Sequence, residues 1–370
     1  MPAERRAWAV IAGGGTGGHA VPAIAIGRAL VESGHDAGSI RFVGSKRGVE
    51  SRLVPAAGFP LTVLPGRGIA RRLTIDNVGA VLGLVAGFFQ AFALIARLRP
   101  RVTVSVGGYA SVPAALASVL WRVPVVVAEQ NAVPGLANRL IGRFAAASAV
   151  SFEGTALPRT VVTGNPVRQE ITHLAPRSAA RAELDLPADR LVIAVSGGSL
   201  GARRINNAVL GLAARWADRS DVCLYHVIGR RDYADSSARR PEVPAGGIDY
   251  RQIEFEDRMD LLLAAADVGV QRAGASTVAE LAVAGLPSVL VPLPGAPGDH
   301  QTFNARRLAD AGAAVLVPDG ELDADRLAAE LAPLLDSGET RRSMAAAAIA
   351  LGRPDAAARV AALVEEKARG

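Results

Sequence analysis

Short apolar runs recur along the chain, and segments with helical patterns lie between most of them. Apolar runs that alternate with helices predict buried strands of a parallel sheet, joined by βαβ crossovers. In the first half of the chain, strands are expected at Trp8–Ala12, Ile40–Val43, Leu61–Leu64, Val102–Val106, Val123–Ala128, Ala147–Ser151 and Thr160–Thr163. In the second half, they are expected at Leu191–Val195, Cys223–Ile228, Tyr250–Phe255, Val268–Val270, Ser288–Val291 and Ala314–Val317. This pattern predicts the α/β fold class.

The strand pattern restarts after residue 190, which indicates two Rossmann-like domains. A length of 370 residues is sufficient for two domains of ordinary size. The break is expected near Thr163–Arg168, which gives an N-terminal domain over residues 1–165 and a C-terminal domain over residues 166–353. The polar segment 235–247 contains proline and glycine and predicts a surface loop. Three helices are expected at the end of the chain, near Ala324–Asp336, Glu339–Leu351 and Asp355–Ala368.

The first expected strand ends in a run of glycines that leads directly into a helix. Five of the six residues from Gly13 to Gly18 are glycine, and His19, the only ionisable side chain of this loop, follows at the helix start. Glycine permits positive φ and close approach of a ligand, while the N–H groups at a helix start favour an anion. Five glycines exceed what a tight turn requires, so the loop predicts a phosphate site.

The same loop fits the glycine fingerprint of dinucleotide-binding proteins, Gly13-x-Gly15-x-x-Gly18. That fingerprint is normally followed, about 20 residues later, by an acid at the end of strand two. Here strand two ends in Gly44-Ser45-Lys46-Arg47, which contains no acid. The basic pair could hold a 2′-phosphate instead, so an NADP-dependent reductase remains an alternative at this point.

Polar or glycine-rich segments also follow other expected strands, where ligands bind in open α/β sheets. Two of them are Gly107-Gly108-Tyr109 and Glu129-Gln130-Asn131. In the second half, Gly197-Gly198-Ser199-x-Gly201 repeats the spacing of Gly14-Gly15-Thr16-x-Gly18. Most dehydrogenases have one such turn, whereas a two-domain nucleotide-sugar transferase can use both.

A further candidate site follows the strand at Val268–Val270. Ser276 or Thr277 is expected to cap a helix whose first turn holds Glu280. Glu280 is either a capping-box acid or an acceptor for two ribose hydroxyl groups.

Residues 78–96 are uncharged and almost wholly apolar. The segment is just long enough to span a bilayer, but only five residues separate it from the next strand of the same sheet. A helix packed on the sheet and a helix resting on a membrane surface are the two favoured interpretations, and a spanning helix is a distant third. Arginines flank the segment at positions 67, 71, 72, 97, 99 and 101 and would suit anionic headgroups.

Composition narrows the function classes. Lysine and arginine number 41 against 35 acidic residues, a balance that suits phosphate-rich ligands or an anionic membrane. No nucleic-acid-binding module is evident, so no nucleic-acid partner is expected. The single cysteine, Cys223, cannot form an internal disulfide, which is typical of a reducing compartment. The apolar run after Arg6 is too short for a signal peptide.

Six motifs, in this order, resemble those of the MurG family, the lipid-linked N-acetylglucosaminyltransferases of peptidoglycan synthesis. They are Gly14–His19, Gly107–Tyr109, Glu129–Asn131, Gly164–Arg168, Gly197–Ala202 and Gly274–Glu280. The resemblance covers essentially the whole chain. It implies a GT-B fold, with two Rossmann-like domains facing a cleft and a C-terminal helix, 354–370, that joins the N-terminal domain.

The resemblance also implies an inverting transfer of N-acetylglucosamine from UDP-N-acetylglucosamine to the 4-hydroxyl of undecaprenyl-diphospho-muramyl-pentapeptide. The enzyme is expected to act as a peripheral protein on the cytoplasmic side of the cell membrane. Another UDP-sugar transferase or epimerase is the main alternative. A cell-wall scaffold without catalysis is a further one.

Site residues are implied position by position. Donor contacts are Thr16, Gly17, Gly18, Asn131 and Arg168, and the uridine diphosphate site is Ser199, Phe255, Glu256, Ala275, Ser276, Thr277, Val278, Ala279, Glu280 and Gln301. The family usually has an apolar residue where this chain has Glu256, so a backbone contact is expected to survive there, whereas the family's side-chain contact does not carry over directly. Gln301, rather than the adjacent His300, is assigned to the site.

An inverting transfer needs a base for the acceptor hydroxyl and stabilisation of the departing diphosphate. His19 is the expected base, because a helix N-terminus disfavours the imidazolium form. The alternative is that His19 only hydrogen-bonds diphosphate or acceptor. Tyr109 and Glu129 are weaker catalytic candidates. No Asp-x-Asp pair lies among the motif residues, so neither a metal nor another cofactor is expected.

Overall fold

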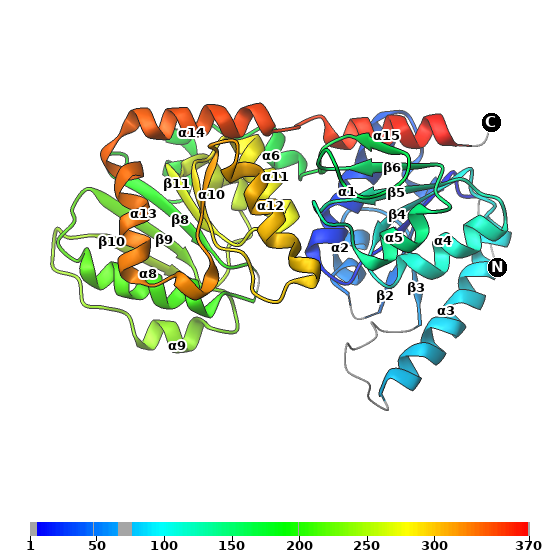
Figure 1. The fold of residues 1–370 in the computed structure, drawn as a ribbon, viewed down its shortest axis with the longest axis horizontal. Coiled ribbons are helices and arrows are strands. Elements are labelled where there is room, and N and C mark those ends of the chain that lie inside the picture. Colours follow the sequence, from blue (N-terminus) through cyan, green and yellow to red (C-terminus); the bar gives the residue numbers. More distant parts are fainter. Residues whose placement is uncertain (1–5, 47, 66–75, 199, 369–370) are drawn as a thin grey trace. The chain divides into compact units, whose positions relative to one another are not determined.

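The computed structural model describes residues 6–46, 48–65, 76–198 and 200–368, and the chain divides into two compact units (Figure 1). Unit 1 runs to Arg168 and also contains the chain from Arg353 onward, while unit 2 is Gln169–Gly352. Ser199, an expected site residue, lies outside the described residues.

Unit 1 contains a parallel sheet of seven strands in the order β3-β2-β1-β4-β5-β6-β7. The strands are β1 (Ala9–Gly13), β2 (Ile40–Ser45), β3 (Leu61–Leu64), β4 (Val102–Gly107), β5 (Val125–Glu129), β6 (Ala147–Val150) and β7 (Thr160–Val162). The helices are α1 (Gly17–Glu32), η1 (Ala37–Ser39), α2 (Glu50–Ala56), α3 (Asp76–Leu98), α4 (Ser111–Leu120), α5 (Leu136–Gly142) and α15 (Ala356–Lys367). Because the strand order reverses between β1 and β4, their carboxyl ends form a switch point where ligands bind in such sheets.

Both faces of this sheet are covered by helices. Ile11 of β1 packs in a core with α1 and α15, whereas its neighbour Val10 packs in a second core with α3 and α4. Successive strand residues point to opposite faces, so a strand covered on both faces reads as a continuous apolar run. The C-terminal helix α15 lies against α1 (Figure 1). Between them, the Glu365 carboxylate lies 2.9 Å from Nε2 of His35.

Unit 2 repeats the arrangement with a six-stranded parallel sheet in the order β10-β9-β8-β11-β12-β13. Its strands are β8 (Leu191–Ser196), β9 (Val222–Val227), β10 (Asp249–Ile253), β11 (Val268–Gln271), β12 (Ser288–Leu290) and β13 (Ala314–Leu316). Its helices are α6 (Gln169–Thr172), α7 (Arg177–Glu183), α8 (Arg203–Arg215), α9 (Tyr233–Ala238), α10 (Met259–Ala265), α11 (Ala275–Ala284), η2 (Pro297–Asp299), α12 (His300–Ala309), η3 (Asp319–Glu321), α13 (Ala324–Asp336) and α14 (Gly338–Leu351). The equivalent switch point therefore lies between β8 and β11.

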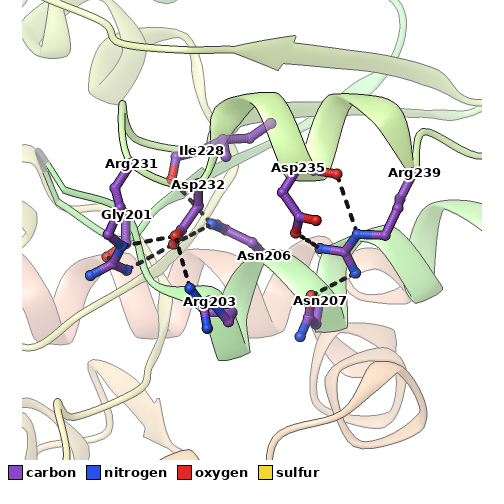
Figure 2. A network of polar contacts seen from close by, with 9 residues as sticks. All are labelled: Gly201, Arg203, Asn206, Asn207, Ile228, Arg231, Asp232, Asp235 and Arg239. Carbon is purple, nitrogen blue, oxygen red and sulfur yellow. Dashed lines mark hydrogen bonds and ion pairs between the residues drawn. The ribbon is translucent and has the colours of Figure 1, made fainter.

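Every expected strand is present, and each bound lies within two residues of the expected one. The α/β class and the two Rossmann-like sheets are therefore confirmed. The expected surface loop over 235–247 is partly wrong, since Tyr233–Ala238 forms α9. Arg239 stabilises this short helix, because it pairs with Asp235 at 2.6 Å and donates to Asn207 of α8 at 3.0 Å (Figure 2).

Candidate functional site

The glycine loop of unit 1 has a backbone that only glycine adopts readily. Gly13, Gly14 and Gly15 have φ values of +155°, +144° and +102°. The loop after β4 lies directly against it, because a Cβ added to Gly108 would stand 2.3 Å from the carbonyl oxygen of Gly14. The two loops of the switch point therefore meet through their backbones, and side chains larger than hydrogen would separate them.

His19 lies in the first turn of α1, immediately beside this contact. Its Nδ1 is 3.1 Å from the hydroxyl oxygen of Thr16, the residue that precedes the helix. On its other edge, a Cβ at Gly107 would lie 3.2 Å from Nε2 of the imidazole and 3.2 Å from the amide nitrogen of Asn138. The imidazole thus lies between the loops after β1 and β4, with an amide of α5 nearby.

Glu129 ends β5 and is buried, with 4% of its surface exposed. Its Oε1 accepts from the backbone and side-chain nitrogens of Asn131 at 3.0 and 3.2 Å. Its Oε2 accepts from the backbone of Gly135 at 3.0 Å and from Asn138 at 2.9 Å. Four donors on one carboxylate make Glu129 the residue that shapes the 129–138 loop and orients Asn131.

The remaining expected residues of unit 1 are also placed. Tyr109 is half-buried in the loop between β4 and α4. Thr16, Gly17 and Gly18 form the start of α1, and Arg168 is the last residue of unit 1 before the chain enters unit 2. The loops after β1, β4 and β5 therefore bring His19, Tyr109, Glu129 and Asn131 to one edge of the sheet.

Glu50 belongs to this site and was missed by the motifs. It begins α2, is 2% exposed, and accepts a 2.8 Å hydrogen bond from the backbone N–H of Gly15. The dinucleotide pattern requires an acid at the end of strand two, where there is none. Glu50 is the acid that is found nearby. It lies five residues after Ser45, and its carboxylate points back to the glycine loop of β1.

In unit 2, the glycine loop after β8 is held by the loop after β9. A Cβ on Gly201, whose φ is +86°, would stand 2.3 Å from the carbonyl oxygen of Ile228. Asn206 of α8 donates to the same carbonyl at 3.2 Å and to Asp232 at 3.3 Å, as Figure 2 shows. Two elements that follow different strands are thereby joined at the start of α8.

Asp232 is the centre of this cluster and is only 5% exposed. Arg231 donates to both of its oxygens at 2.8 Å, and Arg203 lies 3.9 Å away (Figure 2). The hydrogen bond from Arg231 lowers the pKa of Asp232 below its ordinary value, so the carboxylate is ionised at neutral pH. The two arginines give this edge of unit 2 a positive border.

A buried polar chain continues from Asn206 into the sheet. His226 of β9 contacts the Asn206 carbonyl through Nε2 and the Tyr250 hydroxyl through Nδ1, both at 3.0 Å. Because an amide oxygen only accepts, Nε2 carries the proton, and Tyr250 donates to Nδ1. Burial lowers the pKa of His226 to about 3, so the imidazole is neutral.

Phe255 and Glu256, two expected residues of the uridine diphosphate site, follow β10. The Glu256 carboxylate accepts from the Tyr225 hydroxyl at 2.5 Å and from the backbone of Arg258 at 2.9 Å. Burial raises the pKa of Glu256, but the hydrogen bonds from Tyr225 and Arg258 together lower it by more, so the net shift is downward. The side chain is thus held within unit 2, while Arg230 lies over the Phe255 ring at 4.3 Å from its centroid.

The capping assignment around Glu280 was wrong. Helix α11 begins at Ala275 with Gly274 as its N-cap, there is no side-chain capping hydrogen bond, and its first turn contains no acid. Glu280 therefore lies in the second turn, which removes the capping-box interpretation. Ala275, Ser276, Thr277, Val278, Ala279 and Glu280 are consecutive on α11.

Gln301 lies in the first turn of α12 and accepts from the backbone of Leu293 at 2.9 Å. It therefore ties the start of α12 to the loop after β12. His300 contacts the carbonyl of Pro297 at 2.8 Å. The expected residues of unit 2 thus follow β10, β11 and β12 at the carboxyl edge of its own sheet.

Comparison with known proteins agrees with this arrangement. Residues 9–150 match the glycosyltransferase family 28 N-terminal domain, and residues 192–360 match the glycosyltransferase family 28 C-terminal domain. A relative from Moorella thermoacetica is 43% identical over 94% of this chain and 95% of its own length, and one from Nocardioides sp. is 42% identical over 98% of each. Both bear the name UDP-N-acetylglucosamine--N-acetylmuramyl-(pentapeptide) pyrophosphoryl-undecaprenol N-acetylglucosamine transferase.

Among solved structures, the crystal structure of MurG from Acinetobacter baumannii matches with a TM-score of 0.77 at 28% sequence identity. The match covers 97% of this chain and 99% of that chain. The fold is therefore GT-B, and the two glycine loops belong to the two halves of one transferase architecture.

The buried neutral His226 predicts a pH-dependent stability of unit 2. Because the folded pKa is about 3 and the ordinary value is 6.5, the unfolded chain binds the extra proton between these values. The stability that this group contributes is present above pH 6.5 and is lost as pH falls toward 3. The advantage of the wild type over His226→Gln should shrink by about 2 kcal/mol between pH 7.5 and pH 5.

Urea unfolding followed by Trp216 fluorescence, with Trp8 and Trp121 replaced by Phe, measures this advantage in unit 2. A difference between wild type and His226→Gln that is the same at pH 7.5 and pH 5 would show that His226 is not buried in its neutral form.

Proposed function

This chain belongs to glycosyltransferase family 28, and we propose that it transfers N-acetylglucosamine from UDP-N-acetylglucosamine to a lipid-linked muramyl-pentapeptide. The acceptor atom is the 4-hydroxyl of the muramyl sugar, and the anomeric configuration inverts. The observation that carries the proposal is the identity of 43% with a transferase of that name over 94% of this chain. The paired switch-point loops support it, because each unit has its own ligand edge.

The donor nucleotide is assigned to unit 2. Glu280 accepts the ribose hydroxyls from the second turn of α11, and the backbone at Phe255 and Glu256 contacts uracil. The Glu256 carboxylate is already bonded to Tyr225 and Arg258, which supports recognition through backbone atoms at this position. The diphosphate lies at the start of α8, where N–H groups and the nearby Arg203 and Arg231 favour negative charge. Arg168, which ends unit 1, stabilises the same diphosphate as it departs.

The acceptor hydroxyl is deprotonated by His19 of unit 1. We assign the ring proton to Nδ1, which lies 3.1 Å from the Thr16 hydroxyl oxygen and then donates to it, so that Nε2 is the atom that receives the proton. Glu129 acts through Asn131, which it orients, and Tyr109 borders the same edge. Thr16, Gly17, Gly18 and Asn131 contact the donor sugar. As the bond from the anomeric carbon to the acceptor oxygen forms, the bond to the UDP oxygen breaks, and the proton passes to His19.

The proposed base is tested by steady-state kinetics with UDP-N-acetylglucosamine and a lipid-linked muramyl-pentapeptide acceptor. His19→Ala should lower kcat by about 10²-fold to 10⁴-fold, since a general base contributes that much. Glu280→Ala should mainly raise the donor KM. His173→Ala, an exposed histidine of unit 2, is the matched control and should retain wild-type constants.

Reactions without the lipid acceptor, and reactions with NADPH, separate the alternatives. Turnover that needs no lipid would indicate an epimerase or a transferase with a soluble acceptor. NADPH oxidation would indicate the reductase. If His19→Ala and Glu280→Ala both change only KM, the base assignment fails.

A peripheral position on the cytoplasmic face of the membrane is the second part of the proposal. Within the described residues, no helix is sufficiently long and apolar to cross a membrane. Unit 1 nevertheless exposes large apolar side chains on or beside α3, α4 and α5: Val85, Phe89, Leu120, Trp121, Leu136, Leu140 and Phe144. Helix α3 packs against α4, and α4 packs against α5. The ring centroids of Phe92 on α3 and Trp121 at the end of α4 lie 5.0 Å apart.

Basic residues accompany this apolar surface. Arg122, Arg139 and Arg143 are exposed beside it, whereas Arg67, Arg71 and Arg72 lie outside the described residues. Apolar side chains that enter the headgroup region, together with adjacent arginines, favour anionic lipid surfaces.

Vesicle sedimentation tests the membrane proposal. Phe89→Ser combined with Phe144→Ser should weaken binding to vesicles rich in phosphatidylglycerol by at least about tenfold, since each buried phenylalanine contributes about 1.5–3 kcal/mol. Val161→Ser, which changes an exposed apolar residue on β7, should bind like the wild type. Equal vesicle binding by the wild type, the double variant and Val161→Ser would show that the apolar surface does not bind the membrane.

A further inference from the structure

The carboxylate of Glu50 lies beneath the glycine loop of unit 1 and is almost entirely removed from solvent, with 2% exposed. Its Oε2 accepts from the Gly15 N–H at 2.8 Å. Its Oε1 accepts from the N–H and the hydroxyl of Ser45 at 2.8 and 2.7 Å. Burial raises the pKa of Glu50, but the hydrogen bonds from Gly15 and Ser45 lower it, and the net shift is downward. A charged group is therefore held by neutral donors.

The surrounding backbone is shaped to this carboxylate. A Cβ on Gly14 would stand 2.2 Å from Cδ of Glu50, and a Cβ on Gly48 would stand 2.0 Å from Oε2. At Gly44, the corresponding distance to Cγ is 2.5 Å. Three glycines from the β1 and β2 loops therefore leave room for one side chain. Part of the glycine content that resembles a phosphate site serves this internal carboxylate.

We propose that Glu50 is a positioning residue for the transfer reaction, which fixes the Gly13–Gly18 loop through Gly15 and thereby holds Thr16 and His19 in place. The path is short, because Gly15 directly precedes Thr16, whose hydroxyl lies 3.1 Å from Nδ1 of His19. This inference rests on the proposed function, in which His19 is the base.

The same contact restricts where an anion can bind. Since Gly15 N–H already donates to a carboxylate, a phosphate on this loop would have to use the later N–H groups at the start of α1. The negative charge beneath the loop also opposes a phosphate at Gly15 itself. Glu50 therefore directs the loop toward positioning the base rather than enclosing a diphosphate.

Glu50→Gln tests the proposal, since it keeps the shape and removes the second acceptor oxygen. Whichever way the amide points, its NH₂ faces either the Gly15 N–H or the Ser45 N–H, and two donors repel. In the lipid-acceptor assay, kcat should fall by about tenfold or more, the size expected for losing a hydrogen bond to a charged group. The affinity for UDP, measured by calorimetry, should stay within about twofold of wild type, because UDP is assigned to unit 2.

Two matched controls separate positioning from stability. Val54→Ala creates a cavity in the core on the same helix, where Val54 is 1% exposed, and it should lower the melting temperature without changing kcat per UDP-binding site. Glu32→Gln, at the exposed end of α1, should behave as wild type. Equal losses of kcat in Glu50→Gln and Val54→Ala would mean that Glu50 is merely structural and would overturn the proposal.

Amide hydrogen exchange provides a readout that needs no substrate. The backbone amides of residues 13–20 should exchange faster in Glu50→Gln than in Val54→Ala. Each variant is measured the same number of degrees below its own melting temperature. This result would stand even if the lipid-linked acceptor proved inactive, in which case only the proposed function fails. Unchanged exchange in this segment would overturn the positioning role.

If Glu50→Gln does not fold, Ser45→Ala tests the same positioning role. It removes one of the two donors to Oε1, so the carboxylate can rotate away from Gly15. A fall in kcat with unchanged UDP affinity is expected, and wild-type kinetics would contradict the proposal.

Discussion

In each unit, a buried polar side chain lies at the switch point, where it binds the glycine turn directly in unit 1 and braces the helix that follows the turn in unit 2. In unit 1, Glu50 binds the N–H of Gly15, and in unit 2, Asn206 joins the start of α8 to the carbonyl of Ile228 and to Asp232. A backbone with φ values of +102° at Gly15 and +86° at Gly201 has few conformational restraints of its own. The position of the unit 1 loop therefore depends on the hydrogen bond from Gly15 to Glu50, and the position of the unit 2 loop depends on the Ile228 carbonyl, which packs against Gly201 and accepts from Asn206.

The two turns share a spacing but differ in charge. Unit 1 has a carboxylate beneath its turn and an imidazole at the helix start, whereas arginines at positions 203 and 231 border the turn of unit 2. A negative charge beneath a loop opposes a diphosphate, and nearby guanidinium groups favour one. Under the proposed function, one sheet topology, present twice, provides a place for proton transfer in unit 1 and a place for the nucleotide in unit 2.

Much of this architecture could be predicted from local pattern. Strands buried on both faces are continuous apolar runs, and the residues after them carry the motifs, so the sheets and loop positions followed directly. The contacts that fix the loops could not be predicted. Glu50 reaches Gly15 across 35 residues, and Glu256 reaches Tyr225 on the neighbouring strand, and neither pair has a periodic signal. The pattern predicts Glu280 in the first turn of its helix, because Ser276 and Thr277 resemble capping residues. Helix α11 instead begins at Ala275 after Gly274, so Glu280 lies in the second turn.

The central claim is that the two similar turns have different ligands, and a crystal structure of the enzyme with UDP tests it most directly. In that complex we expect uracil beside the backbone of Phe255 and Glu256, the ribose at Glu280 and the diphosphate at the start of α8. Gly15 should still donate to Glu50 in that complex. Uridine diphosphate bound on the Gly13–Gly18 loop, with the Gly15 N–H turned from Glu50 to a phosphate, would contradict it.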